Sequence, residues 1–386
     1  MGGAGGGGMG AEYQLAPGAA LPGLRCKRRT EVRAMLVTLR PFISSRSTQT
    51  PTMTPSQIVN YLDQHVVGQE EAKRQLAVAI FTHYKKIALA EPDKVEIIKS
   101  NVLLVGPTGT GKTLICETLA RVLQVPFVTA NATSLAQSEF VNDEIEAILL
   151  RLIDKAEGDI GRAQRGIVFI DEIDKLKAIS GQQGTLRGTS GEGVQHALLK
   201  IMEGVPVRIK GAHYIDTTQV LFICGGAFVG LEETRARTRA FGFISTSESD
   251  NQKMLDRLNS RTKPTDLFEF GLIQEFAGRL PIIAHFNPLS REMMVRIMTE
   301  PKNSIYKQYR QMLANDGVEL NIEALVFQQI ADLAMEYKVG ARSLRGIFEE
   351  MLTPTMYLLP DHPEVRQVKF TSLFEEPKFI GTRPAG

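Results

Sequence analysis

The residues Gly106–Thr113 fit the phosphate-binding pattern G-x-x-x-x-G-K-[ST] in every position. Glycines let successive backbone N–H groups curl around phosphates, and a following helix points its positive N-terminal end at them. Lys112 adds a positive charge at the β- and γ-phosphates, and the Thr113 hydroxyl is a ligand for Mg²⁺. The alternative is a glycine-rich turn without a ligand. The pattern predicts that ATP contacts Gly106, Pro107, Thr108, Gly109, Thr110, Gly111, Lys112, Thr113 and Leu114.

A second chemical signal is an acidic pair at the end of an apolar segment. Residues 167–170 are all apolar and are followed by Asp171 and Glu172. This pattern is typical of a buried parallel strand whose carboxyl end presents two carboxylates. In a Walker B arrangement, Asp171 holds Mg²⁺ and Glu172 orients the attacking water, as phosphoryl transfer requires. The alternative is that both carboxylates only cap the helix that follows.

The composition is that of a soluble, globular protein. The chain has 386 residues, 43% of them hydrophobic and 23% charged, which suits one large or two ordinary soluble domains. The net charge is +2, but residues 1–52 hold seven of the 45 basic residues and only two of the 43 acidic ones. The remainder is therefore mildly acidic, and we expect no general nucleic-acid binding.

The cysteines and the hydropathy pattern bear on location. Cys26, Cys116 and Cys224 are far apart and odd in number, which favours neither a disulfide framework nor a four-cysteine zinc site. No apolar segment has membrane-spanning length. We therefore expect a reducing, cytoplasmic location, no zinc and no membrane partner.

The N-terminal residues 1–53 are predicted to be a disordered, Gly/Arg-rich extension, because they begin with nearly pure glycine and show no sustained period. Their arginine-rich, acid-poor character also resembles an organellar transit peptide, which would place the protein in an organellar matrix. A non-native extension is the other alternative, since Thr54 begins a well-formed helix with a natural cap.

The rest of the chain divides into two parts. Up to residue 287, apolar strands alternate with helices, which predicts an α/β domain with a parallel sheet covered by helices on both faces. Residues 288–380 are predicted to form a smaller, mainly helical domain, followed by a tail at 381–386. The predicted helices are 55–64, 70–86, 291–313, 322–337 and 341–359, and the predicted strands are 101–105, 126–129, 167–170, 220–224, 280–286, 318–322 and 365–370.

Several segments in order resemble the ClpX family, the AAA+ unfoldase subunits of the Clp protease. The resemblance covers residues 54–379 and implies an AAA+ P-loop NTPase module, a small helical lid domain and a homo-hexameric ring. The segments that carry it are 67–73, 106–113, 170–175, 190–195, 197–200, 221–228, 275–281 and 340–342.

The resemblance assigns roles that spacing does not. It implies that Arg279 is an arginine finger for the neighbouring subunit's nucleotide and that Arg342 is a sensor of the nucleotide in its own subunit. It also implies that Val66 and Val67 flank the adenine. A surface ion pair is the alternative for either arginine.

The chain departs from the family pattern in two regions, the amino terminus and the pore loop. The family's N-terminal zinc domain needs four cysteines, and Cys26 is the one cysteine in the first 115 residues. The pore loop, Gly-Tyr-Val-Gly in the family, is Glu139-Phe140-Val141-Asn142 here. Phe140 and Val141 are expected to grip substrate, although the flexible glycines are replaced. The alternative is that Phe140 packs between subunits.

A third departure concerns peptidase docking. The family's Ile-Gly-Phe tripeptide is replaced by Phe241-Gly242-Phe243. Exposed aromatic residues on a polar loop favour a partner pocket, here that of a ClpP-type peptidase. A locally packed hairpin turn is the alternative.

Two functions follow from these patterns. The first is an ATP-dependent unfoldase that threads unfolded or tagged proteins, usually into a ClpP-type peptidase. The second is an ATP-gated remodelling or assembly factor that does not thread and needs no peptidase. The chain has no peptidase constellation in a plausible context, so we expect an ATPase that does not itself cut peptide bonds.

Overall fold

The computed structural model describes residues 53–89, 99–177, 191–209, 213–231 and 262–381. The predicted N-terminal extension lies outside these residues except for Met53, and so does the predicted docking tripeptide Phe241-Gly242-Phe243. The predicted boundary between two domains near residue 287 stays a prediction.

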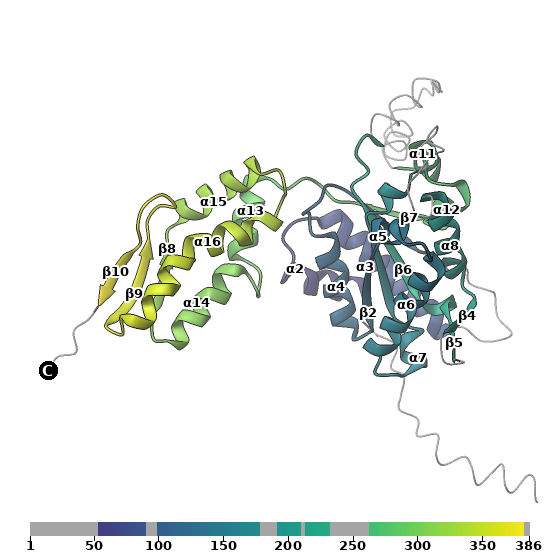
Figure 1. Cartoon of the computed structure of the whole chain (residues 1–386), viewed down its shortest axis with the longest axis horizontal. Helices are drawn as coiled ribbons and strands as arrows, with labels where there is room; N and C mark the ends of the chain where they lie inside the picture. Colours follow the sequence, from purple (N-terminus) through teal and green to yellow (C-terminus); the bar gives the residue numbers. More distant parts are fainter. Residues whose placement is uncertain (1–52, 90–98, 178–190, 210–212, 232–261, 382–386) are drawn as a thin grey trace, which may run out of the picture. The chain divides into compact units, whose positions relative to one another are not determined.

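A five-stranded sheet positions the predicted nucleotide site. Its order is β2-β3-β6-β1-β7, and every neighbouring pair is parallel. Because the strands are parallel, their carboxyl ends meet at one edge, which is where ligands bind in such folds. The strands are β1 (Val102–Val105), β2 (Phe127–Asn131), β3 (Ile167–Asp171), β6 (Leu221–Gly226) and β7 (Ile282–His285) (Figure 1).

The central strands are buried on both faces, as their unbroken apolar sequences predict. On β1, Val102 and Leu104 join one hydrophobic cluster, while Leu103 and Val105 join another. The first cluster includes buried side chains of α2 (Pro55–Asp63), α3 (Glu70–Leu89) and α4 (Lys112–Leu123). The second includes those of α5 (Ala132–Gln137), α6 (Val141–Lys155), α7 (Ile160–Ala163), α8 (Gly191–Glu203), α11 (Pro264–Phe270) and α12 (Gln274–Gly278).

Short elements connect the main ones. A 3₁₀ helix, η1 (Ile173–Leu176), follows β3 directly. A two-stranded antiparallel hairpin, β4 (Pro206–Ile209) and β5 (His213–Asp216), precedes η2 (Thr217–Gln219) and β6.

The C-terminal part has its own hydrophobic cluster, built from residues between Leu289 and Phe370 with neighbours up to Leu373. A three-stranded sheet of order β10-β9-β8 accompanies four helices (Figure 1). The elements are α13 (Arg291–Thr299), α14 (Ile305–Asn315), β8 (Glu319–Ile322), α15 (Ala324–Glu336), α16 (Arg342–Leu358), η3 (Leu359–Asp361), β9 (Val365–Phe370) and β10 (Lys378–Gly381).

One predicted helix was wrong. Residues 291–313 form two helices, α13 and α14, because Pro301 cannot continue the helix and Ser304 caps the next one through its contact with the Lys307 N–H. Strand β10 was not predicted, because all four of its residues are exposed and carry no burial pattern.

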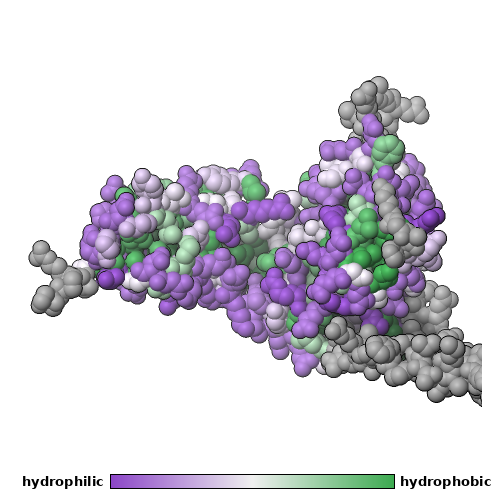
Figure 2. All heavy atoms as spheres, turned by 60° about the horizontal axis from the view of Figure 1, so that its bottom comes forward, coloured by the Kyte–Doolittle hydropathy of each residue, from purple (hydrophilic) through white to green (hydrophobic). Residues whose placement is uncertain are grey.

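The described surface is mainly polar. Figure 2 shows a largely hydrophilic face interrupted by hydrophobic patches. The large apolar side chains that are most exposed include Tyr357, Phe374 and Val229. Among the described residues, no helix combines the length and the apolar character that crossing a membrane requires.

Candidate nucleotide-binding site

The phosphate loop connects β1 to α4 at the carboxyl edge of the sheet. The Gly106 N–H donates to the carbonyl oxygen of Gly226, at the end of neighbouring β6, over 3.1 Å. Gly111 has φ of +96°, in the left-handed region that glycine adopts without strain, and α4 begins at Lys112. The Lys112 Nζ folds back onto the loop and donates to the carbonyl oxygens of Gly106 (2.6 Å) and Pro107 (2.9 Å). Lys112 is therefore already held in the loop that would receive the phosphates.

Two glycines of the loop are required by close backbone contacts. A Cβ atom on Gly106 would collide with the carbonyl oxygen of Phe286, which follows β7. A Cβ atom on Gly109 would collide with the carbonyl oxygen of Val339. The residue after β7 and the segment before α16 thus press against the loop, so Gly106 and Gly109 serve packing in addition to the phosphate binding predicted for them.

Asp171 and Glu172 end β3 at the same edge of the sheet. Glu172 has φ of +60°, and its Oε2 accepts a hydrogen bond from the Thr133 hydroxyl over 2.8 Å. Asp171 Oδ1 accepts from the Glu172 N–H over 2.9 Å. Glu172 occupies the N-cap position of η1 but makes no side-chain capping bond, which argues against the capping alternative for this residue.

Hydrogen bonds favour the ionised form of Glu172. Those from the side chains of Thr133 and, second, Asn131 hold the pKa of the Glu172 carboxyl below its usual range. A charged carboxylate is the form that can polarise a water molecule.

The electrostatics of Lys112 indicate which groups surround it. Burial lowers the pKa of Lys112, and the carboxylates of Asp171 and Asp174 act in the opposite direction. Asp174 is buried, and its Oδ1 accepts from the Ala227 N–H over 3.2 Å. Asp174 was not among the site residues predicted from the sequence. Its position three residues after Asp171, inside a predicted helix turn, is the signal that could have drawn attention to it.

Arg342 lies with the phosphate loop in the described structure. It is the first residue of α16, and the preceding Ala341 N–H donates to the carbonyl oxygen of Gly109 over 3.2 Å. Its positive charge acts on both Lys112 and Glu172. Arg342 therefore lies near Lys112 and Glu172, and its role as a sensor of the nucleotide stays a prediction.

Arg279 lies at the opposite edge of the sheet. It precedes β7, and Ile282 of β7 pairs with Val102, the first residue of β1, whereas the phosphate loop follows the last residue of β1. A strand of four residues spans about 13 Å. Within the chain, Arg279 Nη2 donates to Glu203 Oε1 over 2.7 Å, and both side chains are partly exposed. Within the described residues Arg279 therefore lies away from the phosphate loop and makes an ion pair on the surface, and its role as an arginine finger stays a prediction.

Val66 and Val67, the residues expected beside the adenine, are both buried. The adjacent Lys73 is also buried, and its Nζ donates to Asp63 Oδ1 and to the Val66 carbonyl oxygen, each over 2.7 Å. A buried lysine is thus paired and fixes the backbone of this segment.

The predicted pore residues differ from each other in exposure. Phe140 is 67% exposed and lies just before α6, while Val141 is 7% exposed and belongs to the hydrophobic core. A cavity of about 360 Å³ beside them is lined by residues of both charges, among them Glu139 and Lys200. Phe140 is the one of the two that is presented to solvent.

Sheet order, phosphate loop and acidic strand end together define an AAA-type P-loop ATPase. Residues 98–283 match the family model described as the AAA domain (Cdc48 subfamily). Residues 289–370 match the model for the C-terminal, D2-small domain of ClpB protein. The chain is thus an ATP-binding AAA ATPase.

Curated relatives narrow the class. The chain is 44% identical over 332 residues to ATP-dependent Clp protease ATP-binding subunit ClpX 2 of Wolinella succinogenes, covering 83% of this chain and 81% of the relative. It is 45% identical over 337 residues to the corresponding ClpX of Treponema denticola (84% and 80%). For the ClpX of Porphyromonas gingivalis the identity is 43% over 323 residues (79% and 78%). The chain belongs to the ClpX family.

Proposed function

We propose that this protein hydrolyses ATP in a homo-hexameric ring, unfolds proteins and threads them into a ClpP-type peptidase. The observation that carries the ATPase step is the convergence of Lys112, Glu172 and Arg342 at the carboxyl edge of one sheet. The position of Arg279 at the far edge supports a ring, because that side chain could complete a site only in a neighbouring copy.

The residues present fit ATP with Mg²⁺. Lys112 would leave its two backbone acceptors to meet the β- and γ-phosphates, and the loop amides would surround them. Thr113 and Asp171 would hold Mg²⁺, which neutralises phosphate charge. Glu172, kept ionised by Thr133, would orient the water for in-line attack. Arg342 would report the γ-phosphate to α16.

The proposed partners follow from the same features. Unfolded or tagged proteins would meet the exposed ring of Phe140. The Phe241-Gly242-Phe243 tripeptide would dock a peptidase. We propose no nucleic-acid or membrane partner and no resident zinc, and three scattered cysteines fit a reducing cytoplasm.

A remodelling factor without threading is the second candidate. The observation that favours it is the burial of Val141 together with the loss of both glycines around Phe140. A stiffer, anchored segment would move less with each ATP cycle.

One experiment separates the candidates. Purified protein is given ATP with a folded, tagged substrate, with or without a ClpP-type peptidase. Threading predicts that an unfolded protein stimulates ATP hydrolysis, that the tagged fold is lost without peptidase, and that peptides appear only with it. Hydrolysis that no unfolded chain stimulates supports the remodelling factor.

A further inference from the structure

The chain passes from one hydrophobic cluster to another within a few residues. Phe286 belongs to the cluster on the α3 face of the sheet, and its N–H donates to the Val105 carbonyl oxygen over 2.7 Å. Leu289 already belongs to the C-terminal cluster. The crossing therefore takes place at Asn287-Pro288. Because a residue before proline is restricted to extended conformations, Asn287 presents its N–H and C=O in a defined way.

The Gln69 side chain binds both backbone groups of Asn287. Its Nε2 donates to the Asn287 carbonyl oxygen, and its Oε1 accepts from the Asn287 N–H, each over 2.8 Å. Gln69 is 5% exposed, although it lies 218 residues away in sequence. The carboxamide thus makes the two backbone hydrogen bonds that a neighbouring strand would make to an extended residue.

The backbone at Gln69 is held in an unfavourable conformation. Its φ is +61°, which costs a non-glycine residue on the order of 1 kcal/mol. The preceding Gly68 has φ of +68°, and a Cβ atom there would collide with the Met293 side chain of α13. Two consecutive left-handed residues aim the Gln69 side chain at Asn287, and the paired hydrogen bonds offset the strain.

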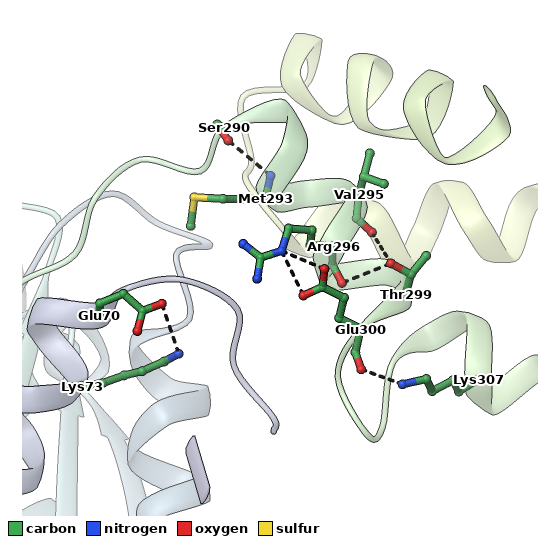
Figure 3. A network of polar contacts seen from close by, with 9 residues as sticks. All are labelled: Glu70, Lys73, Ser290, Met293, Val295, Arg296, Thr299, Glu300 and Lys307. Carbon is green, nitrogen blue, oxygen red and sulfur yellow. Dashed lines mark hydrogen bonds and ion pairs between the residues drawn. The ribbon is translucent and has the colours of Figure 1, made fainter. Parts of the chain in front are cut away.

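The same segment is fixed on its other side. Lys73 Nζ donates to both Asp63 of α2 and the Val66 carbonyl oxygen. These bonds hold Val66, which is expected beside the adenine, in a fixed position close to Gln69 in the chain. Figure 3 shows Glu70 and Lys73 at the start of α3, and Met293 and Arg296 on α13. A second backbone bond, from the Lys302 N–H to the Gln64 carbonyl oxygen over 2.9 Å, joins α2 to the segment after α13.

We infer that Gln69 is a positioning residue that transmits nucleotide occupancy from the adenine side of the site to the C-terminal part through the backbone of Asn287. The inference rests on the proposed ATP cycle. A nucleotide that shifts Val66 and Val67 would move Gln69 with them, and the two hydrogen bonds would carry the shift to the residue at which the chain crosses over.

The test measures distance and catalysis in parallel. Spin labels are placed at Asp154→Cys on α6 and Glu350→Cys on α16, in a Cys26→Ser background, with labelled subunits diluted into unlabelled ones. Cys116 and Cys224 are buried and should not be labelled. The wild-type distance is expected to change when a slowly hydrolysed ATP analogue is added. In Gln69→Met, which has similar volume but no amide, that change should be lost while the affinity for the analogue stays within a few-fold.

A matched control and a rescue sharpen the result. Gln311→Met makes the same chemical change at an exposed position of α14 and should respond like wild type. Gln69→Glu keeps the acceptor for the Asn287 N–H but regains a donor only when its carboxyl is protonated. Its distance response should return as the pH is lowered, which a general loss of packing would not produce. This variant also serves if Gln69→Met does not fold.

Three outcomes would overturn the inference. The first is that the distance in Gln69→Met changes with the analogue as it does in wild type. The other two are a wild-type distance that does not change when the analogue is added, and a distance response of Gln69→Glu that does not depend on pH. ATP hydrolysis and substrate unfolding by the wild-type ring are measured on the same samples. If the wild-type ring hydrolyses ATP and unfolds substrate but one of these outcomes occurs, only the inference about Gln69 is overturned. Absent hydrolysis counts against the proposed function instead.

Discussion

At the scale of single residues, the division of labour between Lys112 and Glu172 can be tested directly. Glu172→Gln keeps the size of the side chain and can still pair with Thr133, but it loses the charge that aligns water. We expect ATP binding within a few-fold of wild type and a loss of turnover of roughly 100-fold or more. Lys112→Ala should instead lose binding. Fluorescent-nucleotide titration and phosphate release measure the two effects, and near wild-type turnover in Glu172→Gln would show that Walker B is misplaced.

Thr133 gives a second residue-scale prediction, on pH. Its hydroxyl is the main reason why the pKa of Glu172 is lowered, so Thr133→Val should raise that pKa toward its ordinary value. A higher pKa means that Glu172 becomes protonated, and inactive as a base, at a higher pH. We therefore expect the acid limb of the pH–rate profile to move upward while the rate at neutral pH changes less. An acid limb that does not move would show that another group controls it.

At the scale of elements, the segment before α6 decides between threading and remodelling. Phe140 is exposed, so Phe140→Ala should fold normally and keep basal ATP hydrolysis while losing unfolding of a tagged substrate. Glu139→Gly should narrow any preference for basic substrate tails, because six copies of Glu139 would make the entrance acidic. Lys200 lines the same cavity and already offsets part of that charge. Matched lysine-rich and glutamate-rich tails provide the measurement, and collapse of the ring on removing Phe140 would favour packing between subunits.

The elements also show what a sequence can and cannot indicate. The phosphate loop and the end of β3 could be predicted because each is a motif of consecutive residues in the sequence. The partners of Glu172 and Asp174 were missed, since Thr133 and Ala227 lie 39 and 53 residues away from them. Gln69 is a similar case, because nothing near it in the sequence indicates Asn287. The packing of Gly109 against Val339 was likewise invisible, as the glycine already fitted the phosphate-binding pattern.

At the scale of the whole molecule, the place of Arg279 predicts shared active sites. Arg279→Ala should bind ATP normally and hydrolyse it roughly 10³-fold more slowly, as expected for loss of an arginine finger. Mixing this variant with Glu172→Gln should recover activity wherever an intact Arg279 meets an intact Glu172. Glu203→Ala is the control, because it removes the ion pair of Arg279 within the chain without removing the guanidinium. No recovery on mixing, or specific activity independent of dilution, would contradict the ring.

The strand that carries the phosphate loop has a consequence for how the protein is made. Strand β1 lies between β6 and β7, and both of these neighbours come much later in the chain. Until residues 221–226 have been synthesised, β1 has two unpaired edges, and one edge stays unpaired until residues 282–285 follow. The backbone of Phe286 that packs on Gly106 comes after both. During this interval the apolar strand β1 lacks the neighbours that cover its edges. A protein of this family should therefore itself depend on chaperones until its sheet closes.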